Sequence, residues 1–322
     1  MKIAVVGCGA VGSFYGAKLA RAGQEVYFLL RSDYEAVRRN GVVIKSAQGD
    51  FNVRPRCAQV PEEIGAADLV MIALKATAND QFPKLLPPLV SDNTAVLTLQ
   101  NGLGNEEALA ELFPVDQIMG GLCFVCLNRI APGVIHHMDH GQVVMGEFKR
   151  WPEPRTHEIA SMFRDAGIPC KVSANLAQSH WEKLLWNIPF NGLGVATAAG
   201  YEAFACEQLP PQLSRSANCM STDLLLADPQ WADLVKALML EVIAAASGLG
   251  FEIPEALADK QIERTRTMGA YKASTVIDFE RGRPIELKAL FLEPLRLANQ
   301  SGEPAPRLHR LCEILARLSR LL

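Results

Sequence analysis

The sequence predicts an α/β domain followed by a mainly helical domain, and three observations support this division. The 322 residues exceed the length at which one hydrophobic core usually keeps growing, so two domains are expected. Up to about residue 175, short apolar runs typical of buried strands alternate with helical or turn segments. Beyond that point, leucine, alanine, isoleucine and methionine recur at helical spacing. We therefore expect an α/β domain over residues 1–175 and a helical domain over residues 176–322.

The chain begins with an apolar run, residues 1–6, that leads directly into Gly-x-Gly-x-x-Gly. A buried parallel strand, a tight turn and the start of a helix are expected in that order. Gly7 would make the turn, Gly9 would let phosphates approach the backbone, and Gly12 would let the helix pack closely on the sheet. The free N–H groups of that helix favour a pyrophosphate. The segment therefore predicts a Rossmann dinucleotide-binding domain, with cofactor contacts from Gly7, Cys8, Gly9, Ala10, Val11 and Gly12.

A helical stretch over residues 13–21 and a stop at Gly23 precede a second expected strand, residues 25–30. The residue that ends this strand selects the dinucleotide. A carboxylate there accepts the ribose hydroxyls of NAD, whereas the 2′-phosphate of NADP needs a cation. Arg31 occupies the place, while Asp33 lies close by and keeps NAD open. NADP is therefore the favoured cofactor, and an ordinary surface arginine is the alternative interpretation.

Polar residues follow two of the remaining strands. Ligands bind outside the carboxyl ends of parallel strands, so residues placed there are candidates for binding. Lys75 follows the apolar run 69–74, and Asn101 follows the run 95–99. Taken alone, a solvated lysine and an ordinary Asn-Gly turn explain these two residues equally well. The other strands of this domain are expected at residues 42–44, 122–127, 143–146 and 169–172.

Two clusters have the composition of metal or redox sites but are better explained as strand residues. Cys123 and Cys126 have Cys-x-x-Cys spacing, yet alternation along a strand directs them to opposite faces. The histidine-rich segment 136–140 lies between two strand-like runs, and residues 139–141 resemble a hairpin turn. We expect no metal site, and we expect the eight cysteines to be small buried hydrophobes rather than a disulfide framework.

Charge and hydropathy argue against two classes of partner. The formal net charge is −3, and no basic patch indicates binding to nucleic acid or to a membrane surface. The most apolar long stretch, residues 231–251, carries Asp233, Lys236 and Glu241 at positions that suit the solvated face of an amphipathic helix. Because the chain opens on a core strand, we expect no signal peptide and take the cytoplasm as the default location.

The helical half contains a polar stripe at residues 183–191. Lys183, Asn187 and Asn191 are four residues apart, on one side of a predicted helix whose other residues are mostly apolar. A solvated stripe is the plain interpretation, but little of so apolar a helix can face water. Pro189 removes a backbone hydrogen bond towards Leu185 and is expected to kink or end the helix, which would displace Asn191 from the stripe.

Together these motifs resemble those of the ketopantoate reductases (2-dehydropantoate 2-reductases), and the resemblance covers nearly the whole chain. It implies a Rossmann domain followed by an all-helical domain of the 6-phosphogluconate dehydrogenase type, with NADPH as cofactor. It also implies reduction of the small 2-oxo acid ketopantoate to pantoate, a step towards coenzyme A. The segments that carry it are residues 7–12, Leu74-Lys75-Ala76, Gln100-Asn101-Gly102, residues 181–191, and Ser274 with Arg283-Pro284-Ile285-Glu286.

The resemblance further implies a role for each matching residue. Lys183 would be the catalytic lysine that protonates or stabilises the substrate oxygen as hydride arrives, and Glu286 would orient it. The remaining contacts would be substrate binding by Asn187, Asn191 and Ser274, a place near the nicotinamide and the reacting carbonyl for Asn101, and contacts of Arg31 and Lys75 with the adenosine phosphate end of NADPH.

Two departures from the family pattern bear on the substrate. Glu286-Leu287-Lys288 replaces the usual Glu-x-Asp, and residues 291–294, Phe-Leu-Glu-Pro, stand where Asn-Gly is common. Two alternatives are therefore kept: a related NADPH-dependent reductase acting on another 2-oxo acid or carbonyl compound, and a non-catalytic NADP-binding sensor. The leucine-rich segment 308–322 could pack within the chain or across a homodimer.

Overall fold

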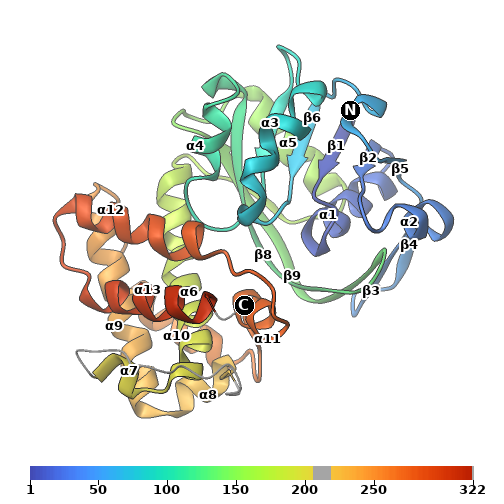
Figure 1. Ribbon diagram of the computed structural model, residues 1–322. Coiled ribbons are helices and arrows are strands. Elements are labelled where there is room, and N and C mark those ends of the chain that lie inside the picture. Colours follow the sequence, from blue (N-terminus) through green and yellow to red (C-terminus); the bar gives the residue numbers. More distant parts are fainter. Residues whose placement is uncertain (206–218, 321–322) are drawn as a thin grey trace. The chain divides into compact units, whose positions relative to one another are not determined.

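The computed structural model describes residues 1–205 and 219–320. The chain divides into two compact units, Met1–Ser179 and His180–Leu322, which are drawn in Figure 1. The first unit contains the strands, and the described part of the second is helical, as the sequence predicts. Among the helices of the described ranges, none has the length and apolar character that crossing a membrane requires.

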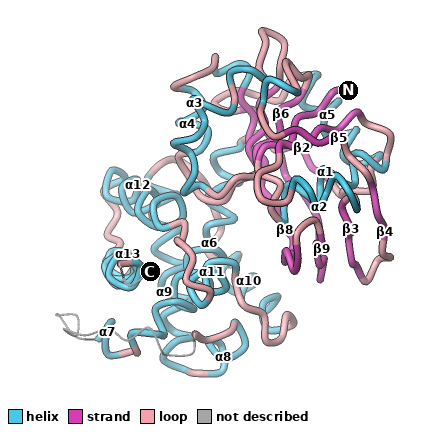
Figure 2. Tube along the Cα trace, turned by 45° about the vertical axis from the view of Figure 1, so that its right-hand side comes forward, coloured by secondary structure: helices cyan, strands magenta, loops and turns pink. Residues whose placement is uncertain are grey.

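A mixed sheet forms the centre of the first unit (Figure 2), with strands in the order β4-β3-β9-β8-β7-β6-β1-β2-β5 and β10 beside β9. Its part β5-β2-β1-β6-β7-β8 is parallel throughout. This is the strand order of the doubly wound dinucleotide-binding fold, whose winding reverses between β1 and β6. The expected Rossmann domain is confirmed. The strands are β1 (Lys2–Val6), β2 (Glu25–Leu29), β3 (Val42–Ser46), β4 (Phe51–Val53), β5 (Arg56–Ala58), β6 (Leu69–Ile72), β7 (Ala95–Thr98), β8 (Ile118–Ala131), β9 (Val134–Glu147) and β10 (Cys170–Val172).

Apolar layers cover both faces of this sheet. Residues 3 and 5 of β1 lie in one layer with Phe14 and Tyr15, and residues 4 and 6 lie in the other with Phe82. A strand buried on both faces explains why the sequence there is continuously apolar rather than alternating. The helices of this unit are α1 (Ala10–Arg21), α2 (Tyr34–Asn40), α3 (Phe82–Leu85), α4 (Asn105–Ala110) and α5 (Pro154–Asp165), with 3-10 segments at Pro61–Glu63, Ala76–Gln81, Pro87–Leu89 and Val115–Gln117.

The antiparallel ribbon of β8 and β9 is longer than predicted, because each strand has 14 residues. Both views show it beside β3 (Figures 1 and 2), with which β9 pairs in parallel. The connecting turn lies at Gly133, where φ is +68°. The hairpin turn predicted at residues 139–141 is therefore wrong, since β9 runs through it. His140 and Gly141 do have positive φ, 63° and 131°, but they form an irregularity in the pairing with β8. A β-bulge uses the same backbone conformations as a turn, so the local residues do not distinguish the two.

His137, from the histidine-rich segment, is a buried structural side chain. Its Nδ1 is 2.8 Å from the Ser46 hydroxyl, and its Nε2 is 2.9 Å from the His140 carbonyl oxygen. Because that carbonyl can only accept, Nε2 carries a proton and donates to it. Within the described residues, no group of His, Cys, Asp and Glu is arranged to hold a metal, and no cysteine is in a disulfide.

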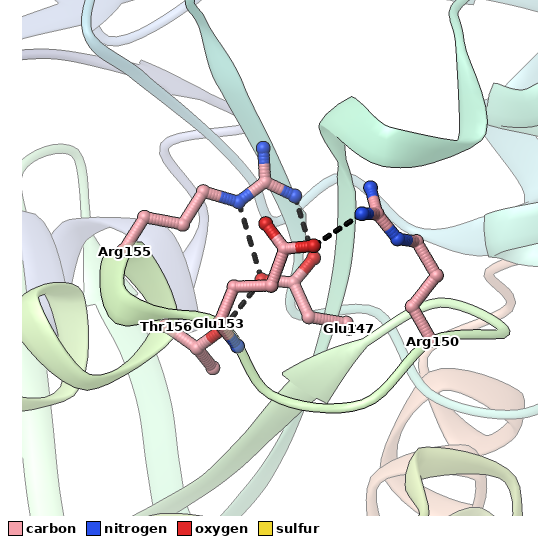
Figure 3. A network of polar contacts seen from close by, with 5 residues as sticks. All are labelled: Glu147, Arg150, Glu153, Arg155 and Thr156. Carbon is pink, nitrogen blue, oxygen red and sulfur yellow. Dashed lines mark hydrogen bonds and ion pairs between the residues drawn. The ribbon is translucent and has the colours of Figure 1, made fainter.

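A buried carboxylate joins the end of β9 to the start of α5 (Figure 3). Glu147 is 2% exposed and accepts from Arg155 Nε at 3.2 Å, from Arg155 Nη2 at 2.5 Å, and from the Thr156 hydroxyl at 2.5 Å. Glu153 caps α5 in a reciprocal capping box with Thr156, and it also pairs with Arg150. All five residues have structural partners, so this charged cluster anchors α5 to the sheet.

The helices of the second unit depart from the sequence predictions at two residues. Pro189 does not end α6, which runs from Leu176 to Ala196. Glu241 does not lie on a solvated face of α9: it is 7% exposed, and its carboxylate accepts from the backbone N–H groups of Arg307 and Leu308 at 3.1 and 2.9 Å. It thereby caps α13. The helices are α6 (Leu176–Ala196), α7 (Glu202–Ala205), α8 (Thr222–Ala227), α9 (Pro229–Gly248), α10 (Ala256–Arg266), α11 (Ser274–Glu280), α12 (Glu293–Ser301) and α13 (Pro306–Ser319), with a π-helical segment at Lys288–Leu292.

The leucine-rich face of α13 packs inside its own unit. Leu308, Leu311, Leu315 and Leu318 are all fully buried, and the helix lies against α9 and α12. Of the two alternatives for segment 308–322, packing within the chain therefore applies to its described residues. The last two leucines of that segment lie outside the described residues.

Candidate active site

The glycines of the loop after β1 are required for two different reasons. Gly7 has φ of +96°, and a Cβ atom added to it would lie 2.3 Å from the Leu74 nitrogen. A Cβ on Gly12 would lie 2.3 Å from the Gly7 carbonyl oxygen. A Cβ on Gly9 would meet nothing within 4 Å. The fold thus requires Gly7 and Gly12, whereas the open space at Gly9 fits a ligand that approaches the backbone.

The start of α1 suits an anionic group. Gly9 is its N-cap, and no side chain caps the helix. The Ser13 hydroxyl donates to the Cys8 carbonyl oxygen at 3.0 Å and does not cap the first N–H groups of the helix. Burial, with lesser contributions from Cys57 and Asp33, raises the pKa of the Cys8 thiol well above its usual value, so the thiol stays neutral. The first turn of α1 holds no acidic residue, and its N–H groups suit a pyrophosphate, so the loop fits a dinucleotide.

The two charged residues after β2 differ in their surroundings. Arg31 is exposed, directly beyond the strand. Asp33 is 4% exposed, and its carboxylate accepts from Arg129 Nη1 at 2.7 Å and from the Gly133 backbone N–H at 3.1 Å. From the sequence alone, the carboxylate of Asp33 leaves NAD possible as the cofactor. In the structure this carboxylate is bound to Arg129 and to the β8–β9 turn instead. Of the two charged residues, Arg31 is therefore the one whose side chain faces solvent beyond the end of β2.

Lys75 and Asn101 lie beyond the carboxyl ends of β6 and β7, which are adjacent parallel strands. Lys75 is exposed and begins the 3-10 segment Ala76–Gln81, whereas Asn101 is half-buried. Asn79 and Asn105, which sequence reasoning missed, connect the two segments by side-chain hydrogen bonds. Asn79 and Asn105 are 26 residues apart, with α3 and β7 between them, so they give no local signal and only the fold reveals this connection.

In the second unit, hydrogen bonds join three of the predicted substrate residues. The Asn191 side-chain oxygen accepts from the Thr275 backbone N–H at 3.0 Å and from the Ser274 hydroxyl at 3.4 Å. Its nitrogen donates to the Asn187 side-chain oxygen at 3.4 Å, one turn earlier on α6. The stripe therefore continues past Pro189. Because the Thr275 N–H can only donate, it fixes the orientation of Asn191 and, through it, directs the Asn187 oxygen towards Asn191.

The two predicted catalytic residues come from segments of this unit that are distant in sequence. Lys183 is half-buried on α6, one turn before Asn187. Glu286 is 4% exposed and lies between α11 and the π-helical segment. The departures from the family pattern have other environments. Lys288 is exposed and Phe291 is completely buried in the core, so a core side chain stands where the family commonly has Asn-Gly.

Comparison with known protein families agrees with this arrangement. A model described as ketopantoate reductase PanE/ApbA matches residues 3–150, and its C-terminal counterpart matches residues 175–319. The chain belongs to the ketopantoate reductase family. The family assignment predicted from the motifs is confirmed, and the two models together match most of this family member.

Three relatives of this ketopantoate reductase family member are similar to it over nearly their whole lengths. A 2-dehydropantoate 2-reductase of Nostoc sp. is 39% identical over 318 residues, which are 96% of this chain and 92% of the relative. The crystal structure of 2-dehydropantoate 2-reductase from Geobacter metallireducens has a TM-score of 0.90 and 42% identity, covering 98% and 99% of the two chains. The corresponding structure from Methylococcus capsulatus has a TM-score of 0.86 and 30% identity, covering 100% and 97%.

Proposed function

We propose that this protein catalyses the NADPH-dependent reduction of 2-dehydropantoate to pantoate. The observation that carries the proposal is the loop at residues 7–12, whose Gly9 leaves space that the fold does not use, in a chain with full-length similarity to 2-dehydropantoate 2-reductases. A dinucleotide site of this kind in the first unit, with a lysine and amide stripe in the second, supports a reductase of a small polar carbonyl compound. Residues 1–175 would supply the nucleotide site and Asn101, and residues 176–322 would supply the other substrate groups.

The proposed cofactor contacts come from the carboxyl ends of adjacent strands. The backbone of residues 7–12 would bind the pyrophosphate, while Arg31 and Lys75 would bind the adenosine phosphate end. The commitment of Asp33 to Arg129 supports NADPH over NADH, because the remaining charge at the end of β2 is positive. When bound, NADPH supplies a hydride to the carbonyl carbon.

Lys183 is proposed as the catalytic residue. Negative charge develops on the substrate oxygen as its carbon is reduced, and an ammonium group beside that oxygen stabilises the charge. The lysine then gives its proton to the oxygen, so hydride and proton together convert the ketone to the alcohol. Glu286 would balance the charge of Lys183 and orient it, since a buried cation needs a counter-charge. Substrate binding is proposed for Asn101, Asn187, Asn191 and Ser274.

The test is to follow NADPH oxidation by the purified protein with 2-dehydropantoate, and with pyruvate and larger 2-oxo acids beside it. Selective turnover of 2-dehydropantoate is expected. Turnover of another compound alone would replace the substrate but keep the chemistry, and the exposed Lys288 and buried Phe291 would then mark the altered region. Tight NADPH binding without turnover of any carbonyl compound would overturn the proposal and favour a sensor.

A further inference from the structure

A chain of side-chain hydrogen bonds runs through the carboxyl ends of β6 and β7. The Thr98 hydroxyl donates to the Gln100 side-chain oxygen at 2.9 Å, and the Gln100 nitrogen donates to the Asn79 oxygen at 2.8 Å. The Asn79 nitrogen donates to the Asn105 oxygen at 2.9 Å, and the Asn105 nitrogen donates to the Asn101 carbonyl oxygen at 3.1 Å. Thr98, Gln100 and Asn105 are each at most 4% exposed. We refer to these four links as the amide chain.

The direction of the amide chain is fixed at its end. A backbone carbonyl can only accept, so the Asn105 nitrogen must face Asn101 and its oxygen must face Asn79. The same reasoning fixes the orientation of Asn79 and then that of Gln100. Each amide in the chain thus uses its oxygen towards one neighbour and its nitrogen towards the next. Replacing one nitrogen by an oxygen breaks a link that no rotation of the others restores.

The amide chain lies just beyond the point where the pairing of β6 with β7 ends. At the ends of these strands, the Leu99 N–H donates to the Ile72 carbonyl oxygen at 2.7 Å. Beyond it the chain enters a turn in which Gly102 and Gly104 have φ of +86° and +87°. Asn79 lies in the 3-10 segment that Lys75 begins, and Asn105 begins α4. The amide chain therefore connects the segment after Lys75 to the turn that carries Asn101.

We propose that Asn79 and Asn105 are positioning residues, which hold the Asn101 side chain in its working position by tying its turn to the segment after β6. The inference rests on the proposed function only for the role of Asn101 itself. A misplacement of about 1 Å near the reacting atoms can cost roughly a hundredfold in rate, so a rigid connection of this kind has a catalytic effect.

The test compares Asn105→Asp with a matched control. Aspartate has the size of asparagine and still accepts from Asn79, but its carboxylate has no N–H for the Asn101 carbonyl oxygen. Thr98→Val removes the first donor of the chain and serves as a second variant if Asn105→Asp fails to fold. Thr94→Val is the control, because Thr94 is equally buried near the other end of β7 and donates to the Ala67 carbonyl oxygen at 2.6 Å.

Two readouts are measured, turnover and amide hydrogen exchange. For Asn105→Asp we expect kcat to fall by about tenfold with KM for NADPH changed less than about threefold, since orientation rather than affinity is lost. Exchange of the amides at residues 100–105 should be faster by about tenfold without any ligand present. Thr98→Val should show smaller changes of the same kind. Thr94→Val should lower the melting temperature while leaving kcat and this exchange unchanged.

A double-mutant cycle separates positioning from general destabilisation. In an Asn101→Ala background, Asn105→Asp should cause no further loss of kcat, because the side chain that it positions is gone. An equal loss in both backgrounds, or unchanged exchange at residues 100–105, would overturn the inference. If the wild-type protein does not turn over 2-dehydropantoate, the proposed function fails, and the exchange comparison with Thr94→Val still decides whether the amide chain holds the turn.

Discussion

The loop at residues 7–12 and the polar stripe of α6 are built from different parts of the chain. The loop presents backbone N–H groups, and its three glycines serve by lacking side chains. The stripe presents a lysine and two amides, and its orientation depends on a hydrogen bond from Thr275, which lies more than eighty residues further along the chain. The conformation of a site made of backbone groups is determined by residues adjacent in sequence. A site made of side chains depends on partners that are distant in sequence. Mutations should therefore act differently in the two regions.

Replacement of Lys183 should have the largest effect and leave the loop untouched. For Lys183→Ala we expect kcat to fall by about a thousandfold, because one group supplies both charge stabilisation and the proton. NADPH binding, followed by nucleotide fluorescence, should change by less than about threefold. Lys236→Ala is the matched control, since this exposed lysine of the same unit pairs with Asp259. Normal turnover by Lys183→Ala would remove this residue from the mechanism.

Substitutions within the loop should separate binding from folding. Gly9→Val adds atoms where the protein has none within 4 Å of the Cβ, so its melting temperature should be unchanged. Its NADPH affinity should fall by about a hundredfold, which corresponds to roughly 2.7 kcal/mol. Gly12→Ala should instead lower the melting temperature, because its Cβ would lie 2.3 Å from a carbonyl oxygen. Equal destabilisation by both variants would show that the two glycines do not differ as described.

Arg31 tests whether one side chain beside the backbone-built loop sets the choice of cofactor. In Arg31→Gln, the ratio of kcat/KM for NADPH to that for NADH should fall by about thirtyfold, because a charge-assisted contact with the 2′-phosphate is lost. Arg39→Gln provides the control, as this arginine is also exposed but belongs to the last turn of α2. An unchanged ratio in Arg31→Gln would assign the preference to other residues.

The two asparagines of the stripe should differ in what they stabilise. Asn191→Ala leaves the buried Thr275 N–H without its acceptor and should lower the free energy of unfolding by about 1–3 kcal/mol in urea titrations. Asn187→Ala removes no acceptor from a backbone donor, so it should lower the free energy of unfolding less than Asn191→Ala does. It should instead raise KM for the substrate. The reverse order of stability would mean that α11 does not depend on Asn191.

The smallest expected effect concerns the core of the helical unit at high pH. Burial, with a lesser contribution from Glu313, raises the pKa of the Cys312 thiol from 9.0 to about 12. The unfolded chain loses this proton first, so the stability that depends on the neutral thiol is complete below pH 9 and declines as the pH rises towards 12. Between pH 9 and pH 10, the wild type should lose about 1 kcal/mol more than Cys312→Ala in urea unfolding under reducing conditions. Equal losses would place the thiol in contact with water.

The same contrast explains what the sequence could predict. The strand, turn and helix around residues 7–12 follow from neighbouring residues, and the structure agrees with them. The turn predicted at residues 139–141 is a bulge instead, because His140 and Gly141 adopt the same positive φ in either setting. Pro189 does not end α6, because the loss of one hydrogen bond is offset by the burial of most of the residues of this helix.

Partners that are distant in sequence could not be predicted. The spacing of Glu241 predicts a place on a solvated face, yet this residue caps α13, more than sixty residues away. Two further contacts join segments that no periodicity in the sequence connects. They are the hydrogen bond from Arg129 to Asp33 and the amide chain through Asn79 and Asn105. Buried polar side chains take whichever donor or acceptor the fold brings to them, and that choice leaves no pattern in the sequence.

The empty space around Gly9 has a consequence for how such loops change over generations. Selection for a folded protein alone would hold Gly7 and Gly12 in place, because their neighbours leave no room for a side chain. A Cβ at position 9 would meet nothing within 4 Å, so without selection for nucleotide binding we expect residues with side chains to be accepted there. A library of variants could be sorted first for folding and then for activity. The difference between the residues accepted at position 9 in the two sorts would measure how strongly nucleotide binding alone constrains that position.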